Sequence, residues 1–333
     1  MPLRVLESKG TGTYGQVFSA INEFTGEIMA VKVCVWDPDH CEPNKKFPMS
    51  VMNELRTLKL VKHPNVIRSL AVYDRWYDNA VIIAMPLAEG GDLDGYLRKD
   101  SSPLPERQRV SFTQQILRGV DYLHTTMGIV HRDLKPGNIL MDSTHEYLKI
   151  SDFGTSVPVS GPDSDRLCRG LCTLFFRPPE YMMAGDDEEE HDPKKVDIWS
   201  LGCIVFQMVF KKYLFVDIMR DSSDVIQWGS CTEIGTLFLI FKMLGTPSEA
   251  TWPGISNLAN YQPCFPKFPY KRIEDSRDFT GVTRSLVNVI GSSVRLYPGH
   301  RLTAAELLRD FTDAGATPEP EAEPIARRTR RRV

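Results

Sequence analysis

One short segment of the sequence has residue types and spacing that suit group transfer. Residues 131–138 read His-Arg-Asp-Leu-Lys-Pro-Gly-Asn. The carboxylate of Asp133 could orient a hydroxyl group and accept its proton, and Lys135 could offset the negative charge of a phosphate. Taken alone, Asp133 could also be an aspartate that forms a turn, so its neighbours decide the interpretation.

A triplet that follows this segment adds candidate ligands for a metal ion. Asp152-Phe153-Gly154 begins fourteen residues after Asn138. Asn138 and Asp152 both offer oxygen ligands, which Mg²⁺ prefers. Transfer of a phosphoryl group needs alignment and neutralised charge more than covalent help from the protein. The two segments supply both, and together they predict phosphoryl transfer assisted by Mg²⁺.

Residues near the N-terminus could hold the phosphates of a nucleotide. Gly10, Gly12 and Gly15 follow the spacing Gly-x-Gly-x-x-Gly, with Val17 two positions later. Missing side chains let backbone N–H groups approach phosphate oxygens, although glycines also serve hairpin turns. Lys32 follows in an apolar run that reads as a β-strand. A lysine buried there would need an anionic partner.

Glu54 can supply that partner. It lies in a predicted helix, 49–61, whose apolar residues recur at helical spacing and which a His-Pro-Asn turn ends. The pair with Lys32 would form when this helix swings inward. The alternative is that Glu54 lies on a solvated helix face.

The elements that must position these residues differ between the two parts of the chain. From 3 to about 83, short β-rich runs surround a single helix. Beyond Gly90-Gly91, long amphipathic or buried helices such as 105–127 and 196–210 dominate. The predicted fold class is α+β, with a small β-rich lobe that carries one helix and a larger, mainly helical lobe.

Composition limits the classes of partner. The 333 residues carry a formal charge of −3, which gives no general argument for nucleic acid or membranes as partners. The first residues lack the pattern of a secretion leader, and no apolar run approaches the roughly 18 residues of a membrane span. We therefore expect a cytoplasmic or nuclear protein. Seven cysteines without paired C-x-x-C spacing predict neither a disulfide framework nor a zinc site.

These residues resemble the protein kinase superfamily over about 3–311, and most closely the cyclin-dependent branch of its CMGC group. Pro48-Met49-Ser50-Val51-Met52-Asn53-Glu54 stands where those kinases carry the helix that docks a cyclin. Thr173-Leu174-Phe175-Phe176-Arg177-Pro178-Pro179-Glu180 is similar to their TLWYRPPE segment. Residues 244–247 and 252–255 resemble their LGTP and WPG segments.

The resemblance implies a bilobal serine/threonine protein kinase that uses ATP and Mg²⁺, acts on protein substrates and prefers Ser/Thr-Pro sites. It places the small lobe at 1–85, the hinge at 86–91 and the large lobe at 92–311 of one catalytic domain. A tail, 312–333, is predicted to be disordered because a Pro/Glu-rich run leads into an Arg-rich end.

The resemblance also implies a set of site residues. The catalytic residues would be Asp133, Lys135, Lys32, Glu54 and Thr173. The ATP-binding residues would be Gly10, Thr11, Gly12, Thr13, Gly15, Val17, Ala30, Lys32, Met85, Pro86, Ala88, Asp92, Asn138, Leu140 and Asp152. Asn138 and Asp152 would hold the metal. Asp197 would brace the 131–138 loop, and Glu180 would pair with Arg301.

Regulation would involve a cyclin-like subunit that docks on the segment ending at Glu54, through Met49, Val51 and Met52. The alternative is that Val51 packs inward with Leu55 and Leu58, and that the two methionines are merely exposed. In the lone chain we expect this helix to rest outward, with Lys32 unpaired. No membrane and no direct nucleic-acid contact is expected.

The sequence departs from the family pattern where kinases of this branch are activated. Cys168 falls at the position of their activating phosphothreonine, and Thr155-Ser156 replaces their Leu-Ala. Insertions lengthen the chain near Asp186 and at 216–231. Two alternatives are a catalytically inactive kinase-like scaffold and a kinase of small molecules. The presence of Lys32, Asp133, Asn138 and Asp152 argues against the first, and the segment from Thr173 argues against the second.

Overall fold

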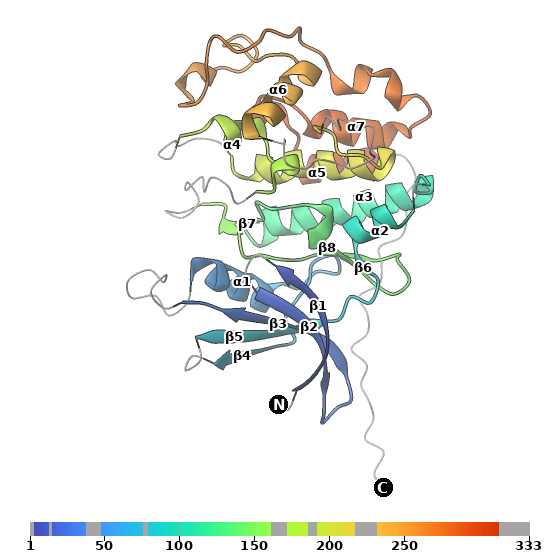
Figure 1. Cartoon of the computed structure of the whole chain (residues 1–333). Coiled ribbons are helices and arrows are strands. Elements are labelled where there is room, and N and C mark those ends of the chain that lie inside the picture. Colours follow the sequence, from blue (N-terminus) through green and yellow to red (C-terminus); the bar gives the residue numbers. More distant parts are fainter. Residues whose placement is uncertain are drawn as a thin grey trace, which may run out of the picture.

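The computed structural model describes residues 3–12, 15–37, 48–75, 79–100, 102–160, 172–185, 192–216 and 232–312. Five antiparallel strands form one sheet in the order β1-β2-β3-β5-β4, and one helix, α1, packs against it (Figure 1). The elements are β1 (Leu3–Gly12), β2 (Gly15–Asn22), β3 (Ile28–Val35), α1 (Met49–Leu60), β4 (Ala71–Arg75) and β5 (Ala80–Pro86). Together they make the predicted small lobe.

The second lobe is mainly helical and lies above the sheet in Figure 1. Its helices are α2 (Leu93–Lys99), α3 (Glu106–Asp121), α4 (Pro179–Met183), α5 (Lys194–Phe210), α6 (Glu233–Leu244), α7 (Arg284–Ser293) and α8 (Ala304–Thr312). Its short strands are β6 (Gly91–Asp92), β7 (Ile129–Val130), β8 (Ile139–Met141), β9 (Leu148–Ile150) and β10 (Val157–Pro158). The predicted α+β fold is thereby confirmed.

Helix α5 forms the centre of the large lobe. Fourteen of its residues, from Val196 to Val209, are buried in an unbroken run, so the helix is apolar nearly all round. It packs between α3 and α7 (Figure 1). Trp199 is fully buried and stacks on Phe215. The predicted helix at 105–127 is also present, but α3 ends at Asp121 and a single π-helical turn continues the chain to Thr126.

Two small sheets carry the candidate site between the lobes. Strands β6, β8 and β9 form one, and β7 pairs with β10 in the other. Ile139 of β8 is opposite Ile150 of β9, so the residues just before β8 and just after β9 meet at the same end of the hairpin. These two positions are Asn138 and Ser151, directly before Asp152.

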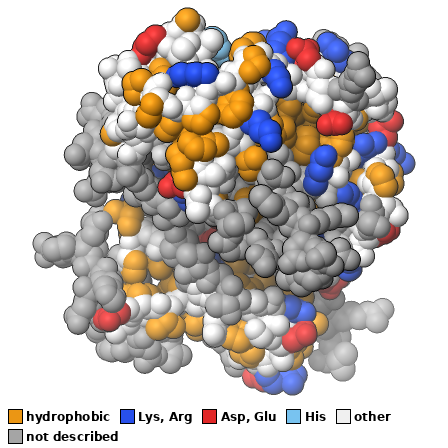
Figure 2. All heavy atoms as spheres, turned by 45° about the horizontal axis from the view of Figure 1, so that its top comes forward, with side chains coloured by type: hydrophobic (Ala, Val, Ile, Leu, Met, Phe, Trp, Pro, Cys, Tyr) orange, Lys and Arg blue, Asp and Glu red, His pale blue; other side chains and the backbone are white. Residues whose placement is uncertain are grey.

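The described surface mixes residue types. Figure 2 shows Lys and Arg side chains of the helical lobe lying among hydrophobic and acidic ones. None of the helices in the described ranges combines the length and apolar character that a membrane span requires. Predictions that lie outside the described residues are those for Thr13, Cys168, most of the insertions near Asp186 and at 216–231, and the tail from 313 on.

Candidate active site

Lys32, in the middle of β3, forms a buried ion pair with Glu54 of α1. Lys32 Nζ lies 2.7 Å from Glu54 Oε1 and 2.8 Å from Oε2. The same nitrogen lies 3.0 Å from Asp152 Oδ1. The Lys32 and Glu54 side chains are only 6% and 2% exposed. The predicted partnership of Lys32 and Glu54 is therefore confirmed.

The charges in this cluster keep Lys32 protonated. Burial alone would lower the pKa of Lys32, but the carboxylates of Glu54 and Asp152 outweigh it and raise the pKa above its ordinary value. Burial raises the pKa of Glu54, and the charge of Lys32 opposes that rise. For Asp152, burial opposes ionisation, yet Lys32 lowers the pKa below its usual 3.8. The cluster thus presents a fixed cation beside an ionised carboxylate.

Helix α1 is packed inward, so the prediction that it rests outward in the lone chain is wrong. Val51 and Leu58 are 4% and 1% exposed and belong to the main hydrophobic core. The hydroxyl of Thr57 lies 3.4 Å from that of Ser156, and both residues are buried. These contacts join the Lys32–Glu54 pair in holding the helix against the rest of the molecule.

The inward position of α1 also corrects the predicted docking surface. Val51 faces the core and cannot serve as a partner contact. Met49 and Met52 are half-buried and remain at the surface of the helix. The spacing of the apolar residues along the helix did not show that Val51 faces the core while the two methionines face outward.

Asp133 is at the centre of a hydrogen-bonded cluster in the 131–138 loop. Its Oδ1 accepts from the Thr173 backbone N–H at 2.9 Å and from Thr173 Oγ1 at 2.8 Å. Its Oδ2 accepts from Lys135 Nζ at 2.7 Å and from Asn138 Nδ2 at 3.3 Å. Lys135 Nζ also donates to Thr173 Oγ1 at 2.9 Å. The structure therefore gathers three other predicted site residues, Lys135, Asn138 and Thr173, around the Asp133 carboxylate.

Asp197 of α5 holds the backbone of this loop in place. It accepts from the backbone N–H groups of His131 and Arg132, each at 2.8 Å, and its Oδ2 lies 2.8 Å from His124 Nε2. Arg132 has φ +67°, a strained conformation for a side chain of its size. The fully buried carboxylate stabilises that turn, as the predicted brace requires.

Thr155 ties the segment after Asp152 to the same loop. Its Oγ1 donates to the His131 carbonyl at 2.9 Å, and its own carbonyl accepts from Arg132 Nε at 2.7 Å. Ser156 Oγ donates to the Phe153 carbonyl at 2.7 Å. The hydroxyl groups of Thr155 and Ser156 are buried, and each has a hydrogen-bond partner. Thr155-Ser156, in place of Leu-Ala, therefore adds hydrogen bonds that a leucine and an alanine could not make.

The predicted glycine loop is the hairpin of β1 and β2. Gly10 is opposite Val17, and Gly12 is opposite Gly15. A Cβ atom at Gly15 would lie 2.5 Å from the Val33 carbonyl oxygen, so only glycine fits there without a shift. Val17 in turn is opposite Lys32, which places the hairpin directly beside the Lys32–Glu54 pair.

The residues predicted to bind ATP beyond this hairpin lie on β3, β5, β6 and β8 and on the chain just after β5. Ala30 is opposite Met85 at the end of β5, and Leu140 of β8 is opposite Asp92 of β6. The Asp92 carboxylate also accepts from the Gly95 N–H at 2.8 Å and so caps α2. Pro86 ends β5, and the carbonyl of Ala88 accepts from the Gly91 N–H at 3.2 Å.

Two residues of this region were missed by sequence reasoning. His124 contacts Asp197, and Glu233 forms an ion pair with Arg177, with Nη1 2.7 Å from Oε1. Their partners are 73 and 56 positions away, so no local pattern links them. The predicted Glu180–Arg301 bridge is present, with distances of 2.5 and 2.7 Å in a fully buried setting.

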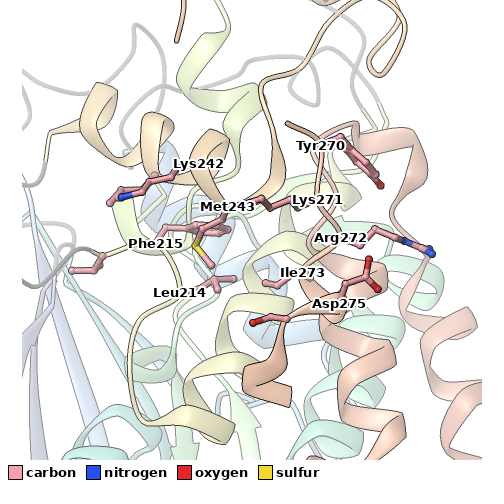
Figure 3. A pocket seen from close by; sticks show the side chains of 12 residues that line it. Leu214, Phe215, Lys242, Met243, Tyr270, Lys271, Arg272, Ile273 and Asp275 are labelled. Carbon is pink, nitrogen blue, oxygen red and sulfur yellow. The ribbon is translucent and has the colours of Figure 1, made fainter. Parts of the chain in front are cut away.

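A large cavity of the described residues lies elsewhere. Its volume is about 770 Å³, and it lies between α6 and the 270–276 segment. Figure 3 shows the side chains that line it, among them Phe215, Met243, Ile273, Lys242 and Lys271. It shares no residue with the Lys32 and Asp133 clusters, whose chemistry identifies the candidate active site.

The residues present fit Mg²⁺ and phosphate. Asn138 Nδ2 donates to the Asp133 carbonyl at 2.8 Å, which leaves Oδ1 as an oxygen ligand. Lys32 contacts only one carboxylate oxygen of Asp152. Ser151 donates to the Asn138 carbonyl from both N and Oγ at 2.9 Å, which fixes Asn138 next to the start of the 152–154 triplet. Mg²⁺ typically takes one or two such protein ligands and completes its shell with phosphate and water.

Comparisons with known proteins agree with this geometry. The protein kinase domain family matches residues 3–311. Cyclin-dependent kinase G1 of Arabidopsis thaliana is 32% identical over 304 residues, which cover 89% of this chain and 46% of that protein. A "probable cyclin-dependent serine/threonine-protein kinase" of Dictyostelium discoideum is 30% identical over 322 residues, 95% of this chain and 21% of that protein. The chain thus spans less than half the length of these curated relatives.

A solved structure shares the fold. A chain from the CAK complex of Chaetomium thermophilum bound to ATP-γ-S has a TM-score of 0.74 to this chain. The match covers 92% of this chain and 89% of that one, at 24% sequence identity.

Proposed function

Because this chain belongs to the protein kinase family, we propose that it transfers the γ-phosphate of ATP to serine and threonine side chains of proteins. The observation that carries the proposal is the joined arrangement of two clusters. Lys32 bridges Glu54 and Asp152, while Asp133 binds Lys135 and Thr173. These side chains are of the kinds that phosphoryl transfer uses for alignment and charge neutralisation, which supports the proposal.

The proposed reaction uses Asp133 as the residue that orients the acceptor. Its carboxylate would accept a hydrogen bond from the acceptor hydroxyl and receive the proton as the new O–P bond forms. Lys135, 2.7 Å from the same carboxylate, would offset charge on the transferred phosphoryl group as its bond to ADP breaks. Thr173 would hold the side chains of Asp133 and Lys135 in fixed positions relative to each other.

Lys32 would act on the nucleotide rather than on the acceptor. Glu54 and Asp152 hold its ammonium group at a fixed place beside the β1–β2 hairpin, where it can bind the α- and β-phosphates. Asn138 and Asp152 would hold Mg²⁺, which when bound neutralises phosphate charge. Because these positions are set before substrate binds, little reorganisation is required at the moment of reaction.

The test separates chemistry from binding. Asp133→Asn should leave nucleotide affinity within about twofold and lower turnover on a generic basic protein by about 10²–10⁴-fold, the range for a positioned acid–base group. Asp152→Asn should weaken Mg²⁺-dependent nucleotide binding itself. Asp275→Asn, at an exposed site in the large lobe, is the control. A wild-type chain that binds nucleotide without any phosphoryl transfer would instead favour a scaffold.

Substrate choice is proposed to depend on Arg177. Its Nε donates to the Cys172 carbonyl at 3.0 Å and Nη2 donates to the same oxygen at 2.5 Å. These two hydrogen bonds occupy the carbonyl oxygen of the residue just before Thr173. The residue that follows the acceptor in a substrate would therefore find no free carbonyl oxygen at this point to accept from its N–H. Proline has no N–H to leave unpaired, and Ser/Thr-Pro sites should be preferred.

A helical partner of cyclin type is proposed to bind the outer face of α1. Met49, Met52, Arg56 and Leu60 recur at helical spacing on this face, and Leu60 is 57% exposed. An amphipathic partner helix could cover this stripe. Affinity purification from the native cell, with mass spectrometry of the bound proteins, tests it: recovery without a cyclin-box protein would contradict the proposal.

A further inference from the structure

A second pocket opens directly beside the Asp133 cluster. It has a volume of about 370 Å³ and is lined by residues of α2, the 131–138 loop, the 172–176 segment and the chain after α5. Lys135 and Thr173, which contact Asp133, belong to its wall. A group held in this pocket would therefore be a near neighbour of the phosphate acceptor.

One wall of the pocket is aromatic. The rings of Phe175 and Tyr213 lie 5.0 Å apart between centroids, and Tyr213 also meets the edge of Phe176 at 6.0 Å. Phe175 and Tyr213 are half-buried, so they are packed together yet still present ring surface to the pocket. Such a wall favours apolar and aromatic side chains over polar ones.

The charged groups at the pocket are already paired with one another, which leaves no carboxylate for an incoming cation. Arg98 lies 2.8 Å from Asp94 and donates to the Tyr213 hydroxyl at 3.1 Å. Asp94, the one carboxylate in the wall, is therefore already neutralised. Lys135, the other cation of the wall, is paired with Asp133 at 2.7 Å. A lysine or arginine side chain entering here would lose water without finding a carboxylate that lacks a cationic partner.

The position of the pocket indicates which part of a substrate reaches it. Cys172 and Arg177, which we assign to the site after the acceptor, do not line it. An extended peptide advances about 3.3 Å per residue with side chains alternating between faces. The residues within reach on the other side of the acceptor are therefore the four that precede it.

We propose that this pocket selects an apolar or aromatic side chain at one of the four substrate positions before the phosphate acceptor, and rejects lysine and arginine there. The proposal rests on the proposed kinase function and adds a substrate class to it. Tyr213 supplies the binding surface, and Arg98 excludes cations while it holds the Tyr213 ring in place.

The experiment uses peptides with one Ser-Pro acceptor in an alanine background. Each of the four preceding positions carries in turn Leu, Phe, Arg or Glu. The full chain is assayed for kcat/KM and, without ATP, for peptide affinity by fluorescence anisotropy. At one position Leu or Phe should exceed Ala by about tenfold, as expected for partial burial of one apolar side chain, and Arg should fall below Ala.

Variants connect that profile to the pocket. Tyr213→Ala should abolish the apolar preference, whereas Tyr213→Phe keeps the ring and should keep the preference. Arg98→Glu, at a largely exposed side chain, should raise the relative kcat/KM for Arg peptides about tenfold. Lys99→Ala is the matched control, because Lys99 is the exposed neighbour of Arg98 on α2 and does not line the pocket.

The outcomes separate this inference from the proposed function. Phosphorylation with a flat profile before the acceptor, or a profile unchanged in Tyr213→Ala and Arg98→Glu, would overturn the pocket assignment and leave the kinase function standing. A preference found only after the acceptor would overturn it too. Selective peptide binding without any phosphorylation would support the pocket while removing the proposed function.

Discussion

Thr173 Oγ1 donates to Asp133 Oδ1 at 2.8 Å and accepts from Lys135 Nζ at 2.9 Å. One hydroxyl group thereby joins the two charged side chains that would act on the acceptor and the phosphate. Thr173 belongs to the 172–176 segment, and its partners belong to the 131–138 loop. The geometry of the proposed reaction therefore depends on how these two distant segments meet.

The first prediction removes that hydroxyl. Thr173→Val keeps the side-chain shape and the backbone N–H bond to Asp133, but loses both side-chain hydrogen bonds. Hydrogen bonds to charged groups contribute about 1.5–3 kcal/mol, so kcat should fall about 10- to 100-fold with nucleotide affinity unchanged. Steady-state kinetics and a nucleotide titration measure both quantities.

The control for this change is Thr173→Ser, which restores the hydroxyl and should recover most of the lost turnover. Full turnover in the valine variant would show that Thr173 does not position Asp133 and Lys135.

The second prediction concerns proline after the acceptor. An unsatisfied buried N–H costs about 1–3 kcal/mol, so Ser-Pro peptides should exceed Ser-Ala peptides roughly tenfold to hundredfold in kcat/KM. Arg177→Lys should reduce the preference, because lysine cannot make the forked contact with the Cys172 carbonyl. Matched peptide pairs provide the measurement.

Glu233→Gln is the control for Arg177. It weakens the exposed Arg177–Glu233 ion pair and leaves the bonds to Cys172 in place, so the proline preference should persist. Equal rates for both peptides in the wild-type chain would refute the role assigned to Arg177.

The third prediction concerns the contact between Thr57 and Ser156, whose hydroxyl oxygens are 3.4 Å apart. Ser156 Oγ already donates its proton to the Phe153 carbonyl, so Thr57 is the donor in this pair. Thr57→Val should lower the turnover of the lone chain roughly two- to tenfold, the effect of about 0.5–1.5 kcal/mol. A bound partner that holds α1 inward should restore it.

Thr57→Ser keeps the donor and serves as the control. If Thr57→Val reduced turnover equally with and without the partner, the contact would not govern the position of α1.

The motifs of the sequence predicted which residues lie close together, because each motif is local. Gly10 to Val17, the 131–138 loop and the 152–154 triplet carry their own spacing, and the structure brings them together around Lys32 and Asp133. Segment type and lobe order were predicted for the same reason, since hydrophobic periodicity is also local.

Contacts between distant segments were not predicted. The Thr57–Ser156 contact spans 99 positions and the His124–Asp197 contact spans 73. The outward position expected for α1 was wrong because an amphipathic pattern shows which face is apolar, but not what covers it. Whether α1 lies inward or outward depends on contacts with residues far away in the sequence, such as Ser156.

The last prediction is a pH dependence centred on Asp197. Burial would raise its pKa, but the hydrogen bond and charge of His124, together with His131, outweigh burial and hold the pKa below its usual 3.8. A carboxyl group with a lowered folded pKa contributes stability above its unfolded pKa and loses that contribution as the pH falls through the folded value.

Asp197→Asn should therefore be less stable by about 1–3 kcal/mol, because a buried donor loses its partner. The stability difference from wild type should not narrow between pH 7 and pH 5 and should narrow only below about pH 3.8. Urea unfolding of both proteins across this range measures it, with the exposed Asp275→Asn as control. A difference that already narrows between pH 7 and pH 5 would mean that Asp197 does not have the lowered pKa on which this argument rests.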